Sequence, residues 1–279
     1  MSLVWFNGKL IDGPLPLDPA DRGLLLGDGL FETIAVVNGK ALWLEEHLAR
    51  LAKAAIELGI AADLASIRKA IASLLGEAGA HVLRVTLTRG PAARGLASGG
   101  DNPSLIATLD PLPRGFLFQP VKLATSTIRR NEFAPTSRLK TLSYADAIAA
   151  AREAATLGAD DALMLNTSGR AASSTIANLF LLKGNELITP DLSQGILPGV
   201  MRRALLDLAP GLGLDPVERA VLPAELASAD AVFLSSSLRF IRPVTALDAK
   251  PLGKRPLEAI VNALCARAET QCGSDPRLI

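Results

Sequence analysis

An excess of charge of either sign is absent from this sequence of 279 residues. Lysine and arginine together number 29, aspartate and glutamate number 28, and the formal net charge is +1. A protein that binds a nucleic-acid backbone needs a basic excess or a basic stripe with interleaved aromatic residues, and the sequence contains neither. We therefore expect no nucleic-acid partner.

Cysteine and histidine are scarce, with two residues of each. Cys265 and Cys272 are seven residues apart, which on a helix places them two turns apart and too far for a disulfide. So few cysteines and histidines also argue against a zinc site. We expect reduced thiols, no metal and a cytoplasmic protein.

Long hydrophobic runs are missing as well, although 49% of the residues are hydrophobic and can bury a large core. No apolar run approaches the roughly 20 residues that cross a membrane. The first residues lack the basic region and long apolar stretch of a signal peptide. We therefore expect neither a membrane span nor a signal peptide.

The sequence does contain two clear hairpin signals. Asn7-Gly8 and Asn38-Gly39 each lie between two short runs of strand-forming residues, and such pairs are typical of two-residue turns. The hydrophobic spacing then predicts helices over 45–59 and 64–75 and strands over 81–88 and 104–109.

A segment rich in proline and glycine, residues 110–115, is the best candidate for a linker. Strands and helices alternate beyond it, with strands over 121–125, 161–165, 177–182 and 231–235 and helices over 144–157, 200–208, 223–227 and 257–268. We therefore predict an α/β (α+β) protein with a smaller lobe over 1–112, a linker over 113–120 and a larger lobe over 121–279. A cleft between two lobes is a favoured place for a cofactor.

One lysine stands in apolar surroundings, since Lys140 lies between Leu139 and Leu142 just before a predicted helix. Desolvation lowers the pKa of a lysine, and a neutral amine is what Schiff-base chemistry needs. The alternative is a surface lysine whose stem covers apolar groups.

Three further segments could bind an anion. Residues 195–202 place a Pro-Gly pair at a helix start, where free N–H groups and the helix dipole favour a phosphate; the alternative is an ordinary start of a helix. The serines 235–237 end an apolar strand and suit either ligand contact or a polar loop. Arg50, on a helix beside His47, could bind a phosphate or lie in solvent.

The order and spacing of these segments resemble the class IV pyridoxal-phosphate (PLP)-dependent aminotransferases, also called fold type IV. This family includes branched-chain aminotransferases, D-amino-acid aminotransferases and 4-amino-4-deoxychorismate lyases. The matching segments are residues 21–23, 27–33, 47–51, 137–140, 178–180, 195–202 and 236–238. The resemblance implies a two-lobed fold type IV enzyme with PLP in the cleft between its lobes.

The resemblance also implies roles for single residues. Lys140 would carry PLP as a Schiff base and then move the α-proton. Tyr144 would hydrogen-bond the phenolic oxygen of the cofactor or assist the proton transfer, unless it is a packed aromatic. The implied cofactor-binding residues are Arg50, Lys140, Ser173, Ser174, Val200, Met201, Ser236 and Ser237, and the implied substrate-binding residues are Phe31, Arg94 and Leu238.

The sequence departs from the family pattern at Ser173. The family usually has a glutamate five residues before the asparagine that matches Asn178, and this carboxylate pairs with the pyridine nitrogen. A serine cannot stabilise a pyridinium in the same way, and the loss of one charge-assisted hydrogen bond is worth about 1.5–3 kcal/mol. The departure favours the lyase or an unusual transaminase.

The expected function is therefore amino-group transfer between an amino acid and a 2-oxo acid by a PLP enzyme. The first alternative is 4-amino-4-deoxychorismate lyase, which releases 4-aminobenzoate and pyruvate. The second is a PLP-binding protein with little catalysis. A homodimer is implied by the resemblance, because active sites of the family are commonly completed by a neighbouring chain.

Overall fold

The computed structural model describes residues 4–76, 78–100 and 102–278, and its contacts group the chain into two compact units. Unit 1 holds residues 1–113, 139–143 and 268–279, and unit 2 holds residues 114–138 and 144–267. The sequence-based division placed everything after residue 120 in one lobe. Residues 139–143 and 268–279 of that stretch belong to unit 1 instead. This could not be predicted, because contacts between residues far apart in the chain do not appear in local composition.

Unit 1 is built on a six-stranded antiparallel sheet. Its order is β2-β1-β6-β5-β3-β4. The strands are β1 Val4–Phe6, β2 Lys9–Ile11, β3 Gly29–Val37, β4 Lys40–Ala41, β5 Ala80–Thr88 and β6 Leu105–Pro111. Asn7 and Asn38 have φ of 42° and 48°, as the turn between two adjacent strands requires, and both predicted hairpins are confirmed.

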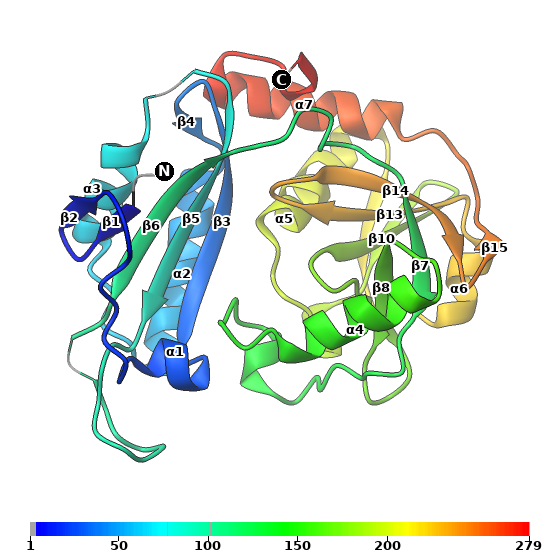
Figure 1. The fold of residues 1–279 in the computed structure, drawn as a ribbon. Coiled ribbons are helices and arrows are strands. Elements are labelled where there is room, and N and C mark those ends of the chain that lie inside the picture. The colour runs from blue at the N-terminus through cyan, green and yellow to red at the C-terminus, as the bar shows by residue number, and fades with distance from the viewer. Residues whose placement is uncertain (1–3, 77, 101, 279) are drawn as a thin grey trace. The chain divides into compact units, whose positions relative to one another are not determined.

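Two helices, α2 Leu44–Leu58 and α3 Leu64–Leu74, pack on one face of this sheet (Figure 1). Leu30 and Ile34 of β3 point to the helices and contact a core that includes Leu48 and Leu51 of α2. Alternate residues of a strand point to opposite faces, so Phe31 and Thr33 face the other way. Both helices lie within one residue of their predicted bounds.

A short extended segment adds to the free edge of β3. The Phe31 N–H donates to the carbonyl of Lys140 at 2.9 Å, and the Leu142 N–H donates to the carbonyl of Gly29 at 2.9 Å. Gly29 is needed here, because a Cβ at this residue would lie 2.8 Å from the backbone carbonyl oxygen of Leu87 as well as 2.8 Å from the side chain of Leu142. These hydrogen bonds tie the backbone of Lys140 to the sheet.

Unit 2 contains nine strands in a mixed sheet. Its order is β12-β11-β10-β13-β14-β7-β8-β9, with β15 beside β14. The strands are β7 Val121–Thr125, β8 Asp161–Leu165, β9 Ala171–Ser173, β10 Asn178–Lys183, β11 Glu186–Thr189, β12 Asp215–Glu218, β13 Ala231–Ser236, β14 Phe240–Leu247 and β15 Lys250–Pro251. Because β9 also pairs with β10, six of these strands form a closed ring.

The ring of unit 2 encloses one apolar cluster. All six strands contribute to it, with residues such as Leu123, Leu163, Leu179 and Leu234. The helices α4 Ala145–Thr156 and α5 Val200–Leu208 contribute nothing to this cluster, and α4 packs instead against Ala162 and Met164, which alternate with the enclosed residues of β8. The side chains of unit 2 thus divide into an enclosed set and a set on the helix side.

Three short or terminal helices complete the chain, namely α1 Arg22–Leu26, α6 Pro223–Ser228 and α7 Glu258–Cys272. Cys265 and Cys272 both lie on α7, are buried and are free thiols, as expected. In the part of the chain that the structure describes, no helix is long and apolar enough to cross a membrane. The same residues contain no cluster of acidic, histidine and cysteine side chains that could hold a metal.

Candidate active site

Lys140 lies in unit 1 beside an aromatic ring and several charged groups. Its Nζ is 4.2 Å from the centroid of the Phe31 ring. Burial, together with the nearby cations Arg50 and Arg84, lowers the pKa of the Lys140 amine to about 8, although the carboxylate of Glu32 acts in the opposite sense. A substantial fraction of this amine is therefore neutral near pH 7–8, as a lysine nucleophile requires.

Arg50 binds a buried carboxylate that the sequence reasoning did not single out. Its Nε donates to Oε1 of Glu32 at 2.8 Å, and its Nη2 donates to Oε2 at 2.6 Å. His47 Nδ1 lies 2.7 Å from Oε2 of the same residue. The signal was present in the sequence, since Glu32 interrupts an apolar strand and a buried acid needs a partner.

The other face of the unit 1 sheet carries a second arginine. Arg84 pairs with Thr33, and Phe31 pairs with Thr86, so all four side chains share one face. The Cζ of Arg84 lies 3.9 Å from the Phe31 ring centroid. The predicted residues Phe31 and Lys140 thus meet an arginine that the sequence reasoning missed, although a charge within a strand-like run of valines and leucines was visible.

Arg94, the predicted substrate-binding arginine, is exposed in the loop between β5 and β6. The backbone of this loop is held next to that residue, because Arg22 donates from Nη1 and Nη2 to the carbonyls of Gly95 and Leu96. The charged groups that shift the pKa of Lys140 are Arg50, Glu32 and Arg84, and Arg94 is not one of them. Its role in substrate binding stays a prediction.

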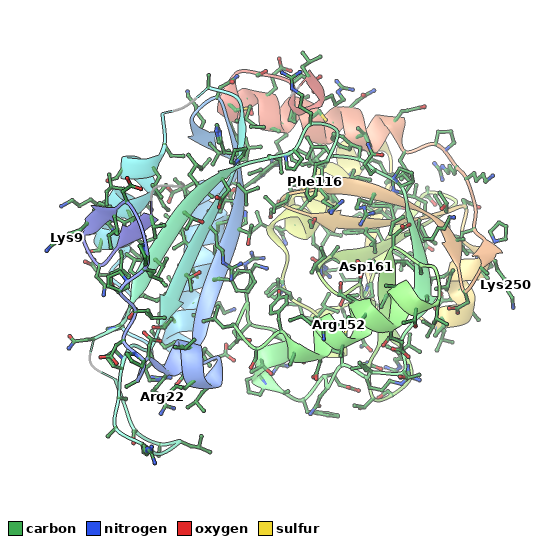
Figure 2. All side chains as sticks on the ribbon, in the orientation of Figure 1. Lys9, Arg22, Phe116, Arg152, Asp161 and Lys250 are labelled. Carbon is green, nitrogen blue, oxygen red and sulfur yellow. The ribbon has the colours of Figure 1, made fainter. Side chains whose placement is uncertain are left out.

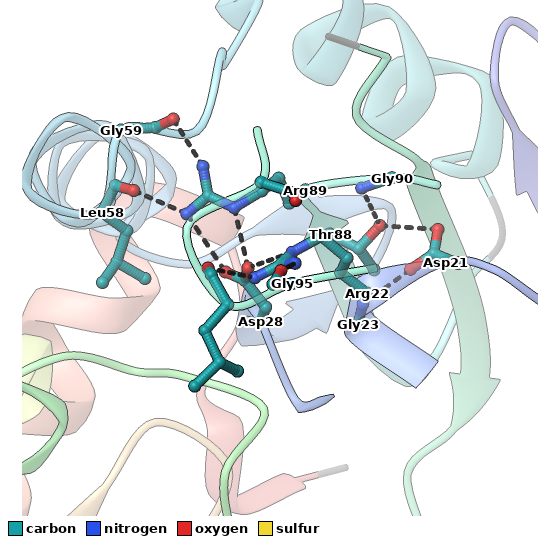
Figure 3. A network of polar contacts seen from close by, with 12 residues as sticks. Asp21, Arg22, Gly23, Asp28, Leu58, Gly59, Thr88, Arg89, Gly90 and Gly95 are labelled. Carbon is teal, nitrogen blue, oxygen red and sulfur yellow. Dashed lines mark hydrogen bonds and ion pairs between the residues drawn. The ribbon is translucent and has the colours of Figure 1, made fainter. Parts of the chain in front are cut away.

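A polar network anchors this loop to α1 and α2 (Figure 3). Asp28 accepts from Nε of Arg22 at 2.8 Å and from Nε of Arg89 at 2.7 Å. Arg89 also donates to the carbonyls of Leu58 and Gly59 at the end of α2. The two hydrogen-bonded arginines hold the pKa of Asp28 below its usual range, although burial alone raises it.

Unit 2 carries a row of polar side chains across three neighbouring strands. Ser173 of β9 pairs with Asn178 of β10, which in turn pairs with Ser235 of β13. Directly paired residues share a face, and all three are buried. The Ser235 Oγ has no hydrogen-bond partner among the described residues, which is uncommon for a buried hydroxyl and suits a group that binds a ligand.

The start of α5 lies against this row. The Nδ2 of Asn178 donates to the carbonyl of Leu197 at 2.9 Å. A Cβ at Gly199 would lie 2.0 Å from the Oδ1 of Asn178, so glycine is required for this close approach. Among the described residues no side chain caps the helix at Gly199, and the N–H groups of Val200 and Met201 begin it. Such a helix start favours an anion.

No carboxylate takes the place of the family's glutamate at Ser173 within the polar row. The Ser173 Oγ donates to the carbonyl of Ser174 at 2.8 Å, and the Ser174 Oγ accepts from the Ala177 N–H at 3.0 Å. Asp161, which lies among the strands of unit 2 (Figure 2), is bound at Oδ1 by the Thr175 hydroxyl at 2.6 Å. The carboxylate of Asp161 therefore serves the turn itself.

A model of the family described as amino-transferase class IV matches residues 29–247. The chain belongs to this family. Members of this family are enzymes, so the chain is an enzyme. Similar solved structures have the fold type IV architecture, which confirms the predicted fold. The activity of the family is amino transfer or aminodeoxychorismate cleavage.

Several relatives of this class IV enzyme match 90% or more of its chain. A D-alanine aminotransferase of Bacillus licheniformis is 31% identical over 90% of each chain. The 4-amino-4-deoxychorismate lyase of Pseudomonas aeruginosa is 33% identical, with a TM-score of 0.81 over 99% of this chain and 100% of the other. A hypothetical aminotransferase of Mycobacterium tuberculosis in its PLP-bound form is 28% identical, with a TM-score of 0.85 over 96% and 99% of the two chains.

The remaining predicted residues of the class IV enzyme lie in unit 2. Ser236 ends β13, Ser237 and Leu238 form the turn to β14, and all three are half-buried. Tyr144 stands at the start of α4, close enough to Arg130 for an electrostatic interaction. Burial lowers the pKa of Arg130, a half-buried guanidinium that the sequence reasoning overlooked because its sequence context, Arg129-Arg130-Asn131, reads as a polar loop.

Proposed function

We propose that this class IV enzyme is a 4-amino-4-deoxychorismate lyase, with PLP held covalently on Lys140. The cofactor of the enzyme is PLP, as its family and the PLP-bound relative indicate. When bound, PLP acidifies the proton on the carbon next to the substrate nitrogen by withdrawing electrons into its ring. The products would be pyruvate and 4-aminobenzoate.

The residues present fit this cofactor in three respects. Lys140 offers an amine whose pKa is lowered to about 8. Val200 and Met201 offer N–H groups at an uncapped helix start, which would receive the phosphate together with the hydroxyls of Ser236 or Ser237. The orphan hydroxyl of Ser235 offers one more buried donor on the same unit.

Lys140 would act on the substrate as a base and then as an acid. Its Nζ would take the proton from the carbon that bears the substrate nitrogen, and the cation formed would give a proton to the leaving pyruvate. Arg84, on the same sheet face as Phe31, would attract a carboxylate of the substrate. Tyr144 would hydrogen-bond the phenolic oxygen of the cofactor.

The single observation that carries the choice of the lyase is the hydroxyl of Ser173. It stands where the family has a carboxylate, and it donates to the neighbouring carbonyl of Ser174. Without a carboxylate partner, electron withdrawal by a pyridine ring is weaker. A reaction whose product becomes aromatic tolerates this loss, because aromatisation supplies much of the driving force.

The second candidate is an amino-acid aminotransferase, which the 31% identity to a D-alanine aminotransferase favours. The substrates would then be an amino acid and a 2-oxo acid. Two incubations separate the candidates: aminodeoxychorismate alone, and a panel of D- and L-amino acids with 2-oxoglutarate. We expect 4-aminobenzoate in the first and little glutamate in the second. Glutamate alone would replace the lyase by the aminotransferase, and neither product would indicate a PLP-binding protein with little catalysis.

Substitution Ser173→Glu tests the observation itself. A restored carboxylate should raise the rate of amino transfer about 10- to 100-fold, the worth of one charge-assisted hydrogen bond at the transition state. Formation of 4-aminobenzoate should change much less. Ser193→Glu, at an exposed residue of the same unit, is the matched control. Equal changes of both reactions would contradict the argument.

We also propose that the enzyme is a cytoplasmic homodimer. Four exposed leucines support an interface between copies: Leu24, Leu25, Leu26 and Leu96 are 61%, 63%, 48% and 83% exposed. The carbonyl of Leu96 is bound by Arg22 of the helix that carries the other three. Light scattering after gel filtration measures the assembly, and a monomer would contradict this part of the proposal.

A further inference from the structure

Glu32 is a charged residue at a place that otherwise belongs to the apolar core. It lies in the middle of β3, its side chain is 1% exposed, and its neighbours on the same face of the strand are Leu30 and Ile34. A carboxylate is strongly disfavoured in such surroundings unless it is paired and hydrogen-bonded. Its presence therefore calls for a physical reason.

Two residues of α2, one helical turn apart, supply the partners of this carboxylate. Arg50 donates from Nε and Nη2, and the contact between Nη2 and Oε2 is 2.6 Å. His47 adds a contact of 2.7 Å through Nδ1. Burial raises the pKa of Glu32, but the charge of Arg50 and the hydrogen bonds of both partners lower it to about 2. Glu32 is therefore an anion near neutral pH.

Arg50 meets Glu32 side-on, through its Nε and Nη2, and this contact limits the motion of the guanidinium. Two of the five N–H donors of its guanidinium are committed to one carboxylate, which fixes the plane of the group. An arginine held in this way does not have to lose its conformational freedom when it binds a ligand. An arginine on the surface would.

Glu32 also lies close to Lys140, because the N–H of Phe31, the residue next to Glu32, donates to the carbonyl of Lys140 at 2.9 Å. Charged or titratable groups that act on this amine include Glu32 from β3, Arg84 from β5, and Arg50 and His47 from α2. Arg50 and Arg84 are cations, and burial keeps the pKa of His47 below its usual value. The negative charge of Glu32 opposes the two cations, so it decides how positive the surroundings of Lys140 become.

We infer that Glu32 is a positioning residue of the Lys140 site, which holds Arg50 in place for the phosphate ester of the cofactor and offsets the positive charge around Lys140. The inference rests on the proposed function, in which Lys140 carries PLP. Glu32 of β3 would thus act on the cofactor through Arg50 of α2.

The first test compares the binding of PLP with that of pyridoxal, which lacks the phosphate. Both are titrated into the cofactor-free full chain. The dissociation constant of pyridoxal divided by that of PLP measures recognition of the phosphate. In Glu32→Gln we expect this ratio to fall about tenfold, the worth of one charge-assisted contact. An unchanged or larger ratio would overturn the positioning of Arg50.

The second test measures the reactivity of Lys140 in the cofactor-free chain by competitive acetylation and peptide mass spectrometry across pH 5–10. Loss of the Glu32 charge should move the midpoint of Lys140 to lower pH. A midpoint lowered by one unit makes Lys140 react about fivefold faster at pH 7. Arg84→Gln should move the midpoint the other way. A midpoint that stays in place in Glu32→Gln would overturn the offset of charge.

Two further variants separate this role from a loss of folding. Glu45→Gln removes another carboxylate that binds an arginine, at the surface of the same helix, and should leave both measurements unchanged. Glu32→Asp keeps the charge on a shorter side chain, so it should keep the midpoint of Lys140 but not the full PLP ratio; loss of both would show a structural role and overturn the inference. Borohydride reduction that marks a lysine other than Lys140 would contradict the proposed function, whereas the acetylation midpoint tests Glu32 without the cofactor.

Discussion

The two units present their polar groups in different chemical forms. In unit 1 the candidate site consists of ionised side chains, with Glu32, Arg50, Arg84 and Lys140 on and around one strand. In unit 2 it consists of uncharged donors, with the N–H groups at the start of α5 and a row of hydroxyls and one amide. The charged groups of unit 1 therefore respond to pH, whereas the donors of unit 2 depend on the path of the backbone.

The comparison is tested most strongly by removing the charged centre of unit 1. Lys140→Ala should lower turnover by at least about 10³-fold, because both the covalent link and the acid–base group are lost. The visible absorbance band of bound PLP should disappear in the same variant. Lys122→Ala, an exposed lysine on β7, should retain both. A band that survives dialysis in Lys140→Ala would exclude this lysine as the carrier.

The next effect is expected from the backbone of unit 2. In Gly199→Ala the new Cβ would lie 2.0 Å from the Oδ1 of Asn178, so the start of α5 must shift. Overpacking of this kind costs about 1–3 kcal/mol, which we expect as a 10- to 100-fold loss of PLP affinity. Gly211→Ala has open space around its Cβ and serves as the control. Equal affinities in the two variants would show that α5 does not bind the cofactor.

The pH response of unit 1 should be visible in the stability of the cofactor-free chain. The pKa of Lys140 is lowered to about 8 in the folded protein, against 10.5 for a lysine in water. Between these values the unfolded chain holds a proton that the folded chain has lost, so the free energy of unfolding rises with pH from about 8 to 10.5. We expect about 1–2 kcal/mol for a half-buried amine. Denaturant titrations should show this rise in the parent and not in Lys140→Met.

The smallest effect concerns a pair that matches Arg50–Glu32 in contact distance but not in burial. Arg68 and Glu45 also form a contact of 2.6 Å, yet their side chains are 47% and 69% exposed. Exposed pairs contribute about 0–1 kcal/mol, so Arg68→Gln should change the free energy of unfolding by less than about 1 kcal/mol. Glu32→Gln should cost several times more, since it removes one charge from an ion pair that is shielded from solvent. If both variants lost a similar free energy of unfolding, burial would not explain the strength of the Arg50–Glu32 pair.

Much of the fold was predictable from the sequence, because it depends on local patterns. The Asn-Gly pairs place both hairpins of unit 1, and the spacing of the hydrophobic residues gives α5 over Val200–Leu208 without error. Strands without such a pattern were missed. β14 is interrupted by Arg242 and Pro243, and β12 is mostly exposed, so neither has a continuous apolar run.

Motif order and residue type are properties of the chain alone, so the family, the lysine in apolar surroundings and the absence of an acid at Ser173 follow from the sequence. The groups that surround this lysine follow only from the tertiary structure. Glu32, Arg50 and Arg84 come from different elements, and 18 residues separate the carboxylate from the guanidinium that it binds. It also decided that the segment around Lys140 joins the edge of β3, because hydrogen bonds between strands form between residues that share no local pattern.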